Sequence, residues 1–87
     1  MRGADMRAYV LINVQPGKST EVANTLTGIP GVISAEPCWG RPDIVAQVQA
    51  EDLPRLGMLV LSTMQSLPGV ESTDTHIVIE PAAVTGA

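Results

Sequence analysis

The segment Gly28-Ile29-Pro30-Gly31-Val32 ends in Pro-Gly-Val, and this tripeptide recurs 38 positions later in Ser66-Leu67-Pro68-Gly69-Val70. In each copy the Pro-Gly pair predicts a turn between a helix-like segment and a strand-like one. The same offset, without gaps, aligns further identical pairs, namely Ala8 with Ala46, Val10 with Val48, Pro16 with Pro54, Val22 with Val60, Thr25 with Thr63 and Ser34 with Ser72. Self-similarity at one spacing, with turn residues in register, indicates that one structural unit occurs twice.

The first unit predicts a strand, a helix and a second strand. Residues 7–14 are rich in Val, Ile, Leu and Tyr, a composition typical of strands. We expect Ser19 or Thr20 to cap a helix that ends at about Thr27, because a side-chain oxygen there can accept a backbone N–H. Residues 32–39 form the second expected strand.

The second unit repeats this order. Residues 43–50 alternate apolar and polar side chains and predict a strand. Asp52 is expected to cap the next helix, and Pro54 lies in its first turn, where a missing N–H costs little. Gly57 weakens this helix slightly. Residues 70–80 form the last expected strand.

Together the two units predict an α+β domain of the ferredoxin-like order β-α-β-β-α-β. This order gives a four-stranded antiparallel sheet with two helices on one face. We expect the domain to span residues 7–80, with tails at 1–6 and 81–87. A two-helix hairpin domain and a small barrel are the alternatives, and the repeat disfavours both.

Composition limits the classes of function. The 87 residues carry 5 Lys and Arg against 9 Asp and Glu, a net charge of −4, which argues against direct binding of nucleic acid. No apolar run is long enough for a membrane span, and the single cysteine, Cys38, excludes an internal disulfide, so we expect a cytoplasmic protein. Only 16% of the residues are charged, against a typical ~25%, which suggests surface that contacts a partner.

The sheet face away from the helices also predicts a partner. The first strand is apolar on both sides, because Val10 and Ile12 alternate with Tyr9 and Leu11. On the third strand, Val45 points away from Ile44. An apolar second face on a small domain favours face-to-face dimerisation, and a monomer with a mixed surface is the alternative.

No catalytic, metal-binding or cofactor-binding group is apparent. We interpret Cys38 as a small buried apolar residue and His76 as packed or interfacial. An enzyme, for instance a small dimeric α+β barrel, would need an acid–base pair or an activated nucleophile. An RNA-binding domain of this topology would need stacking aromatic residues on the central strands, and Tyr9 stands alone there.

A family resemblance supports the same fold. The chain resembles the effector (RAM) domain of the Lrp/AsnC family over about residues 7–80. The resemblance is carried by both Pro-Gly turns, by the loop Gly40-Arg41-Pro42-Asp43-Ile44, and by the ending Val70-Glu71-Ser72-Thr73-Asp74-Thr75-His76-Ile77-Val78-Ile79.

The resemblance implies a module that binds small effectors. In that family, domains pair through their sheets, dimers join into rings, often octamers, and amino acids bind in clefts between dimers. The cleft is built around the loop at residues 39–43 with help from neighbouring chains. Only residues 1–6 precede the first expected strand, too few for a helix-turn-helix domain, so the resemblance implies the stand-alone form of this domain. Full-length regulators of the family are then possible partners for co-assembly. A pure assembly protein without a ligand is the remaining alternative.

Within the loop, three residues are candidates for ligand contact. Gly40 can adopt positive φ and approach a ligand, or simply form a tight turn. Arg41 can hold a ligand carboxylate in a bidentate pair, or be a solvated charge. Asp43 can pair with an α-ammonium group, or accept backbone N–H bonds in a turn.

Three more candidates flank the loop or lie on the last strand. Trp39 can line a pocket or anchor a subunit interface. Thr73 and Thr75 offer hydroxyl groups to a ligand, although such strand residues are usually structural.

Overall fold

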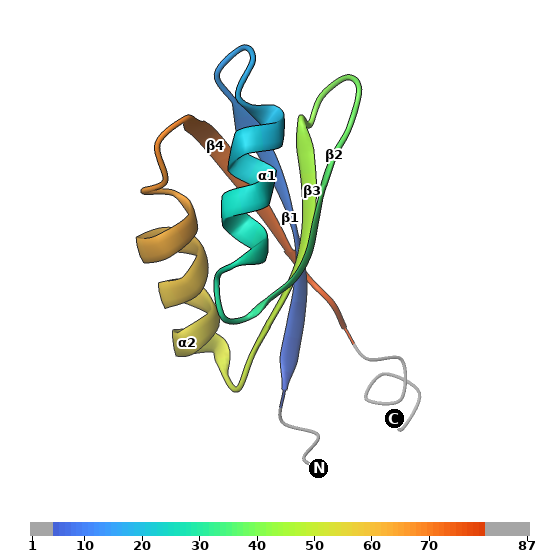
Figure 1. Ribbon diagram of the computed structural model, residues 1–87. Coiled ribbons are helices and arrows are strands. Elements are labelled where there is room, and N and C mark those ends of the chain that lie inside the picture. The colour runs from blue at the N-terminus through green and yellow to red at the C-terminus, as the bar shows by residue number, and fades with distance from the viewer. Residues whose placement is uncertain (1–4, 80–87) are drawn as a thin grey trace.

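A computed structural model describes residues 5–79. The expected order β-α-β-β-α-β and the ferredoxin-like fold are confirmed (Figure 1). The elements are β1 Met6–Val14, α1 Ser19–Thr27, β2 Val32–Pro37, β3 Ile44–Ala50, α2 Leu53–Gly57, the π-helix η1 Met58–Met64 and β4 Val70–Ile77. Of the tails expected at 1–6 and 81–87, residues 1–4 and 81–87 lie outside the described residues, whereas Met6 pairs with Ala50 in the sheet. No helix within 5–79 is long and apolar enough to cross a membrane.

The four strands form one antiparallel sheet in the order β2-β3-β1-β4. Central strand β1 pairs Val10 with Ala46 of β3 and with Thr75 of β4. Figure 1 shows both helices on the same face of this sheet. Directly opposed residues share a face, so every second residue of β1 points toward the helices.

The core lies between the helices and this face of the sheet. It consists of aliphatic side chains, as the lack of Phe requires. The buried members are Ala8, Val10, Ile12, Val14, Val22, Ala23, Leu26, Ile44, Ala46, Val48, Leu56, Val60 and Met64. The alternation expected for residues 43–50 is therefore confirmed.

The two repeated Pro-Gly turns adopt equivalent structures. Gly31 and Gly69 have φ of +98° and +95°, a region that glycine adopts without steric cost. The carbonyl of Gly31 accepts the N–H of Gln49 at 2.8 Å, and that of Gly69 accepts the N–H of Gln15 at 2.8 Å. Each turn is thus hydrogen-bonded to the end of the first strand of the other unit, at the end of β3 for Gly31 and just after β1 for Gly69.

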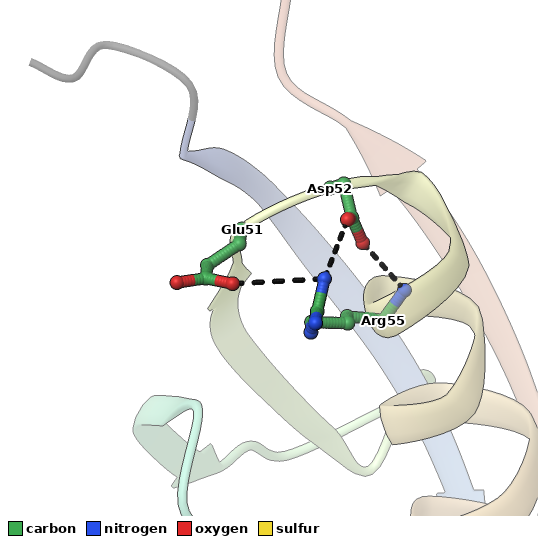
Figure 2. A network of polar contacts seen from close by, with 3 residues as sticks. All are labelled: Glu51, Asp52 and Arg55. Atoms are coloured by element: carbon green, nitrogen blue, oxygen red, sulfur yellow. Dashed lines mark hydrogen bonds and ion pairs between the residues drawn. The ribbon is translucent and has the colours of Figure 1, made fainter.

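The helix starts agree with expectation in one unit and differ in the other. Asp52 caps α2 by accepting the N–H of Arg55 at 2.9 Å, and its second oxygen contacts the Arg55 guanidinium at 2.7 Å (Figure 2). The expected cap of α1 by Ser19 or Thr20 is wrong. The helix already includes Ser19, so Lys18 is the N-cap residue. The Lys18 side chain makes no capping hydrogen bond.

The second helix is not regular throughout. After Gly57 the backbone changes to the π-helix η1, and the N–H of Gln65 reaches back five residues to the carbonyl of Val60 at 3.0 Å. The sequence pattern did not predict this change. π-Helical turns are rare and often accompany functional sites.

The sheet face opposite the helices is mixed. Tyr9 and Leu11 of β1 and Val45 of β3 lie at its centre. They are flanked by polar side chains, namely Gln47 and Gln49 of β3 and Ser72, Asp74 and His76 of β4. The expectation of an apolar face is therefore wrong for its flanks, because β3 and β4 place polar residues at alternate positions.

Candidate functional site

The loop between β2 and β3 is anchored at its base. The N–H of Cys38 donates to the carbonyl of Asp43 at 2.7 Å and closes the loop. Asp43 donates its own N–H to the carbonyl of Ile12 at 2.9 Å, and its Oδ2 accepts the N–H of Val14 at 2.8 Å. The loop is thereby fixed to the end of β1.

The tip of this loop points away from its own chain. Gly40 has φ of +101°, as the sequence suggested, and a Cβ added there would meet nothing within 4 Å. Trp39 is fully exposed, and the Arg41 side chain is 66% exposed. The Arg41–Pro42 peptide is cis. The loop therefore offers an aromatic ring and a cation on a rigid base.

Asp43 has a structural role within the chain. Besides its bond to Val14, its Oδ2 lies 3.9 Å from Nη1 of Arg41. This agrees with the turn interpretation of the carboxylate. The 3.9 Å contact is long, so the Arg41 guanidinium keeps donors that can bind a ligand anion.

The two threonines lie elsewhere in the protomer. They oppose Ile12 and Val10 on β1 and so belong to the helix-facing side of β4. Thr73 Oγ1 accepts a hydrogen bond from Nε2 of Gln65 at 2.6 Å. In the described part of the chain, no hydrogen bond or ion pair joins the loop to either threonine. Because β3 and β1 separate β2 from β4, the candidates form two sets.

Thr75 borders an apolar groove that the sequence analysis did not predict. The groove has a volume of about 170 Å³ and lies between β4 and the second helix. Its lining residues are Leu53, Leu56, Gly57, Val60, Leu61, Thr75 and Ile77. The sequence signal for it is that Leu61 falls out of register with Leu56, Val60 and Met64, the buried residues of this helix, and that Leu53 lies at the helix start; both are more than half exposed.

Charges near the start of this helix are mutually paired. The Arg55 guanidinium contacts Asp52 at 2.7 Å and Glu51 at 3.6 Å, as Figure 2 shows. Arg55 is thus held by two carboxylates beside the groove rather than presented as an unpaired cation.

The structure shows that Cys38 is not buried and leaves only the interfacial interpretation of His76. Cys38 is exposed, not buried, because β2 ends at Pro37 and the thiol lies in the loop, 3.5 Å from the carbonyl of Glu36. His76 is not packed within the protomer. Its side chain is 59% exposed and lies 3.1 Å from Asp74 on the face opposite the helices.

Comparison with known proteins identifies relatives. A family model described as the Lrp/AsnC ligand binding domain matches residues 7–86. The HTH-type transcriptional regulator FL11 of Pyrococcus horikoshii is 33% identical over 90% of this chain and 51% of its own length. The chain therefore spans about half the length of the curated relatives it matches.

Two solved structures are similar over nearly their whole length. TTHA0845 of Thermus thermophilus is 28% identical, with a TM-score of 0.80 over 86% of this chain and 94% of that one. The hypothetical protein PHS023 of Pyrococcus horikoshii is 26% identical, with a TM-score of 0.79 over 88% and 94% of the two chains.

Proposed function

The chain belongs to the Lrp/AsnC ligand-binding domain family, and from this premise we propose that it is a non-enzymatic regulatory module whose effector is an amino acid or a similar small molecule. Its relative FL11 is a transcriptional regulator, which supports a regulatory role. In this proposal its action on transcription runs through assembly, alone or with full-length regulators. We also propose that the protein is cytoplasmic.

The effector site is shared between chains. One observation carries this step: Trp39 and Arg41 follow the edge strand β2, Thr75 lies on the opposite edge strand β4, and no hydrogen bond or ion pair within residues 5–79 joins them. A single small ligand can touch both only if the loop of one copy lies against β4 of another. The exposure of the loop tip supports such a contact.

Each residue of the loop then has a distinct task. Arg41 binds the carboxylate of the effector, because guanidinium and carboxylate form paired hydrogen bonds. Asp43 holds the loop in place through Val14 and adds negative charge for the α-ammonium group. Trp39 packs against the neighbouring chain, since a fully exposed tryptophan is costly in water and typical of interface centres.

Pairing through the open sheet face completes the assembly. Tyr9, Leu11 and Val45 would form the centre of a two-fold interface, with the polar flanks as its rim. Contacts through this face and through the loop use different surfaces. Dimers can therefore join into a closed ring, of which an octamer is the form we propose.

An enzymatic role has less support. Cys38 follows β2 and His76 lies on β4, so the only cysteine and the only histidine of the chain are at opposite edges of the sheet. A thiolate–imidazole pair cannot form within one protomer, and nucleophilic catalysis by this cysteine would lack its base.

Native mass spectrometry with and without a mixture of the twenty amino acids tests the function. We expect an even-numbered oligomer that retains an amino acid. An oligomer that binds none would favour the pure assembly protein, and a monomer would contradict shared sites.

A complementation experiment tests the two-chain site more sharply. Arg41→Ala and Thr75→Val each remove one polar group from a different half of the site, and each should abolish binding in calorimetry. Mixed oligomers of the two variants should recover binding at some of their sites. At those sites the Thr75→Val chain supplies the intact Arg41 loop and the Arg41→Ala chain supplies the intact Thr75. Absence of any restoration in mixed oligomers would show that both groups serve one chain.

A further inference from the structure

Gly57 occupies a helical position that does not require glycine. Its φ and ψ of −61° and −41° are ordinary helical values, unlike the positive φ of Gly31, Gly40 and Gly69. A Cβ added at Gly57 would meet nothing within 4 Å. Glycine is among the least favourable residues inside a helix, so neither backbone conformation nor packing in the protomer explains it.

The missing side chain leaves space in the apolar groove. Gly57 lines this groove together with Leu53, Leu61 and Ile77. A Cβ at position 57 has open space around it, so a large side chain such as leucine fits there and can extend over the groove that Gly57 lines. Glycine leaves this part of the groove open.

The size and lining of the groove indicate what it can hold. Its volume of about 170 Å³ is close to that of an apolar protein cavity of ~150 Å³ that binds benzene. The lining side chains are aliphatic apart from the Thr75 hydroxyl, and none is charged. The nearby cation, Arg55, is already held by Glu51 and Asp52. A charged side chain would lose its hydration in this groove without gaining a partner.

We propose that this groove binds the hydrocarbon side chain of the effector, so that the effector is an uncharged apolar amino acid, and that Gly57 determines how large a side chain is admitted. The inference rests on the proposed function, in which Arg41 of a neighbouring chain binds the effector carboxylate. Thr75 is the polar lining residue of the groove and marks where the apolar side chain gives way to the polar α-carbon groups.

Calorimetry on the full chain tests the proposal with L-leucine, L-methionine, L-phenylalanine, L-alanine, L-lysine and L-aspartate. We expect one of the three large apolar amino acids to bind at least tenfold more tightly than lysine or aspartate. Gly57→Leu should weaken that binding by about tenfold or more, since a pocket discriminates side chains that differ by a methylene by about 10–200-fold. L-Alanine should bind both proteins equally.

Gly57→Ala and Thr63→Ala serve as folding controls. Thr63 is an exposed residue of η1 that does not line the groove. Gly57→Ala should raise Tm by about 4–8 °C, because alanine favours the helix, and a Tm of Gly57→Leu no lower than that of the parent shows that loss of binding is not loss of folding. Thr63→Ala should leave affinity for the apolar amino acid unchanged.

Three outcomes would overturn the proposal. If an amino acid binds in an Arg41-dependent manner but Gly57→Leu leaves its affinity unchanged, the groove is not the side-chain site, although the proposed function stands. If lysine or aspartate binds most tightly, the apolar effector class is wrong. If no amino acid binds and Gly57→Leu instead dissociates the oligomer, both proposals fail and the groove holds a second copy of the chain.

Discussion

The Asp43 carboxylate accepts a hydrogen bond from the backbone N–H of Val14, with 2.8 Å between Oδ2 and the nitrogen. This bond joins the end of the β2–β3 loop to the end of β1 across 29 positions of sequence. The contact is partly buried, so water replaces it poorly. The exposed tip that carries Trp39 and Arg41 therefore stands on a base that the fold itself holds rigid.

Loss of this contact should lower stability. Asp43→Ala leaves the Val14 N–H without its acceptor, and we expect the free energy of unfolding to fall by about 1–3 kcal/mol. Asp43→Asn keeps an acceptor oxygen and should lose less. Urea unfolding followed by circular dichroism measures both, with the exposed Asp74→Ala as a control that should change stability by less than ~0.5 kcal/mol. Equal losses for Asp43→Ala and Asp74→Ala would contradict the anchoring role.

The glycines with positive φ should differ in their tolerance of a side chain. A Cβ at Gly31 would lie 2.9 Å from Cδ2 of Leu59 and 3.1 Å from the carbonyl oxygen of Gln49, whereas one at Gly40 meets nothing. Gly40→Ala should cost about 1–2 kcal/mol from backbone strain alone. Gly31→Ala adds overpacking of about 1–3 kcal/mol. Thermal unfolding of the two variants compares them, and a larger loss for Gly40→Ala would refute this ranking.

Of the two neighbouring carboxylates Glu51 and Asp52, only Asp52 should stabilise the start of α2. Asp52→Ala removes the helix cap, and we expect stability to fall by about 1 kcal/mol. Glu51→Ala removes only an exposed ion pair of 3.6 Å and should change stability by less than ~0.5 kcal/mol. Each variant removes one carboxylate contact to the Arg55 guanidinium, and only Asp52→Ala also removes the backbone hydrogen bond, so their difference in chemical unfolding reports mainly the cap. Indistinguishable midpoints would show that the cap contributes little.

Trp39 should matter for assembly and not for folding. Because its side chain is fully exposed in the protomer, Trp39→Ala should leave the unfolding free energy of the dilute chain within about 0.5 kcal/mol. If Trp39 packs against a neighbouring chain, association should weaken by about 2 kcal/mol or more. Analytical ultracentrifugation over a concentration series measures this, with the exposed Glu21→Ala as control. A Trp39→Ala oligomer as tight as the parent would remove Trp39 from the interface.

Much of the fold follows from local pattern. The Pro-Gly turns at 30–31 and 68–69 divide the chain at equivalent places, and strand alternation decides which residues face the helices. Asp52 could be identified as a cap because capping needs only a side chain and its own helix. The π-helix after Gly57 could not be predicted, since hydrophobic periodicity does not distinguish a change of helical pitch within seven residues.

The sequence by itself determined the element order, the aliphatic core and the family resemblance, and it permitted the positive φ of Gly40. Tertiary structure alone decided which candidates meet. It tied Asp43 to Val14, exposed Cys38 by ending β2 at Pro37, and placed Thr75 in a groove with Gly57 at the edge of the sheet away from the loop. The physical reason is that strand pairing joins residues of distant sequence position, so the partners of a side chain depend on register and strand order.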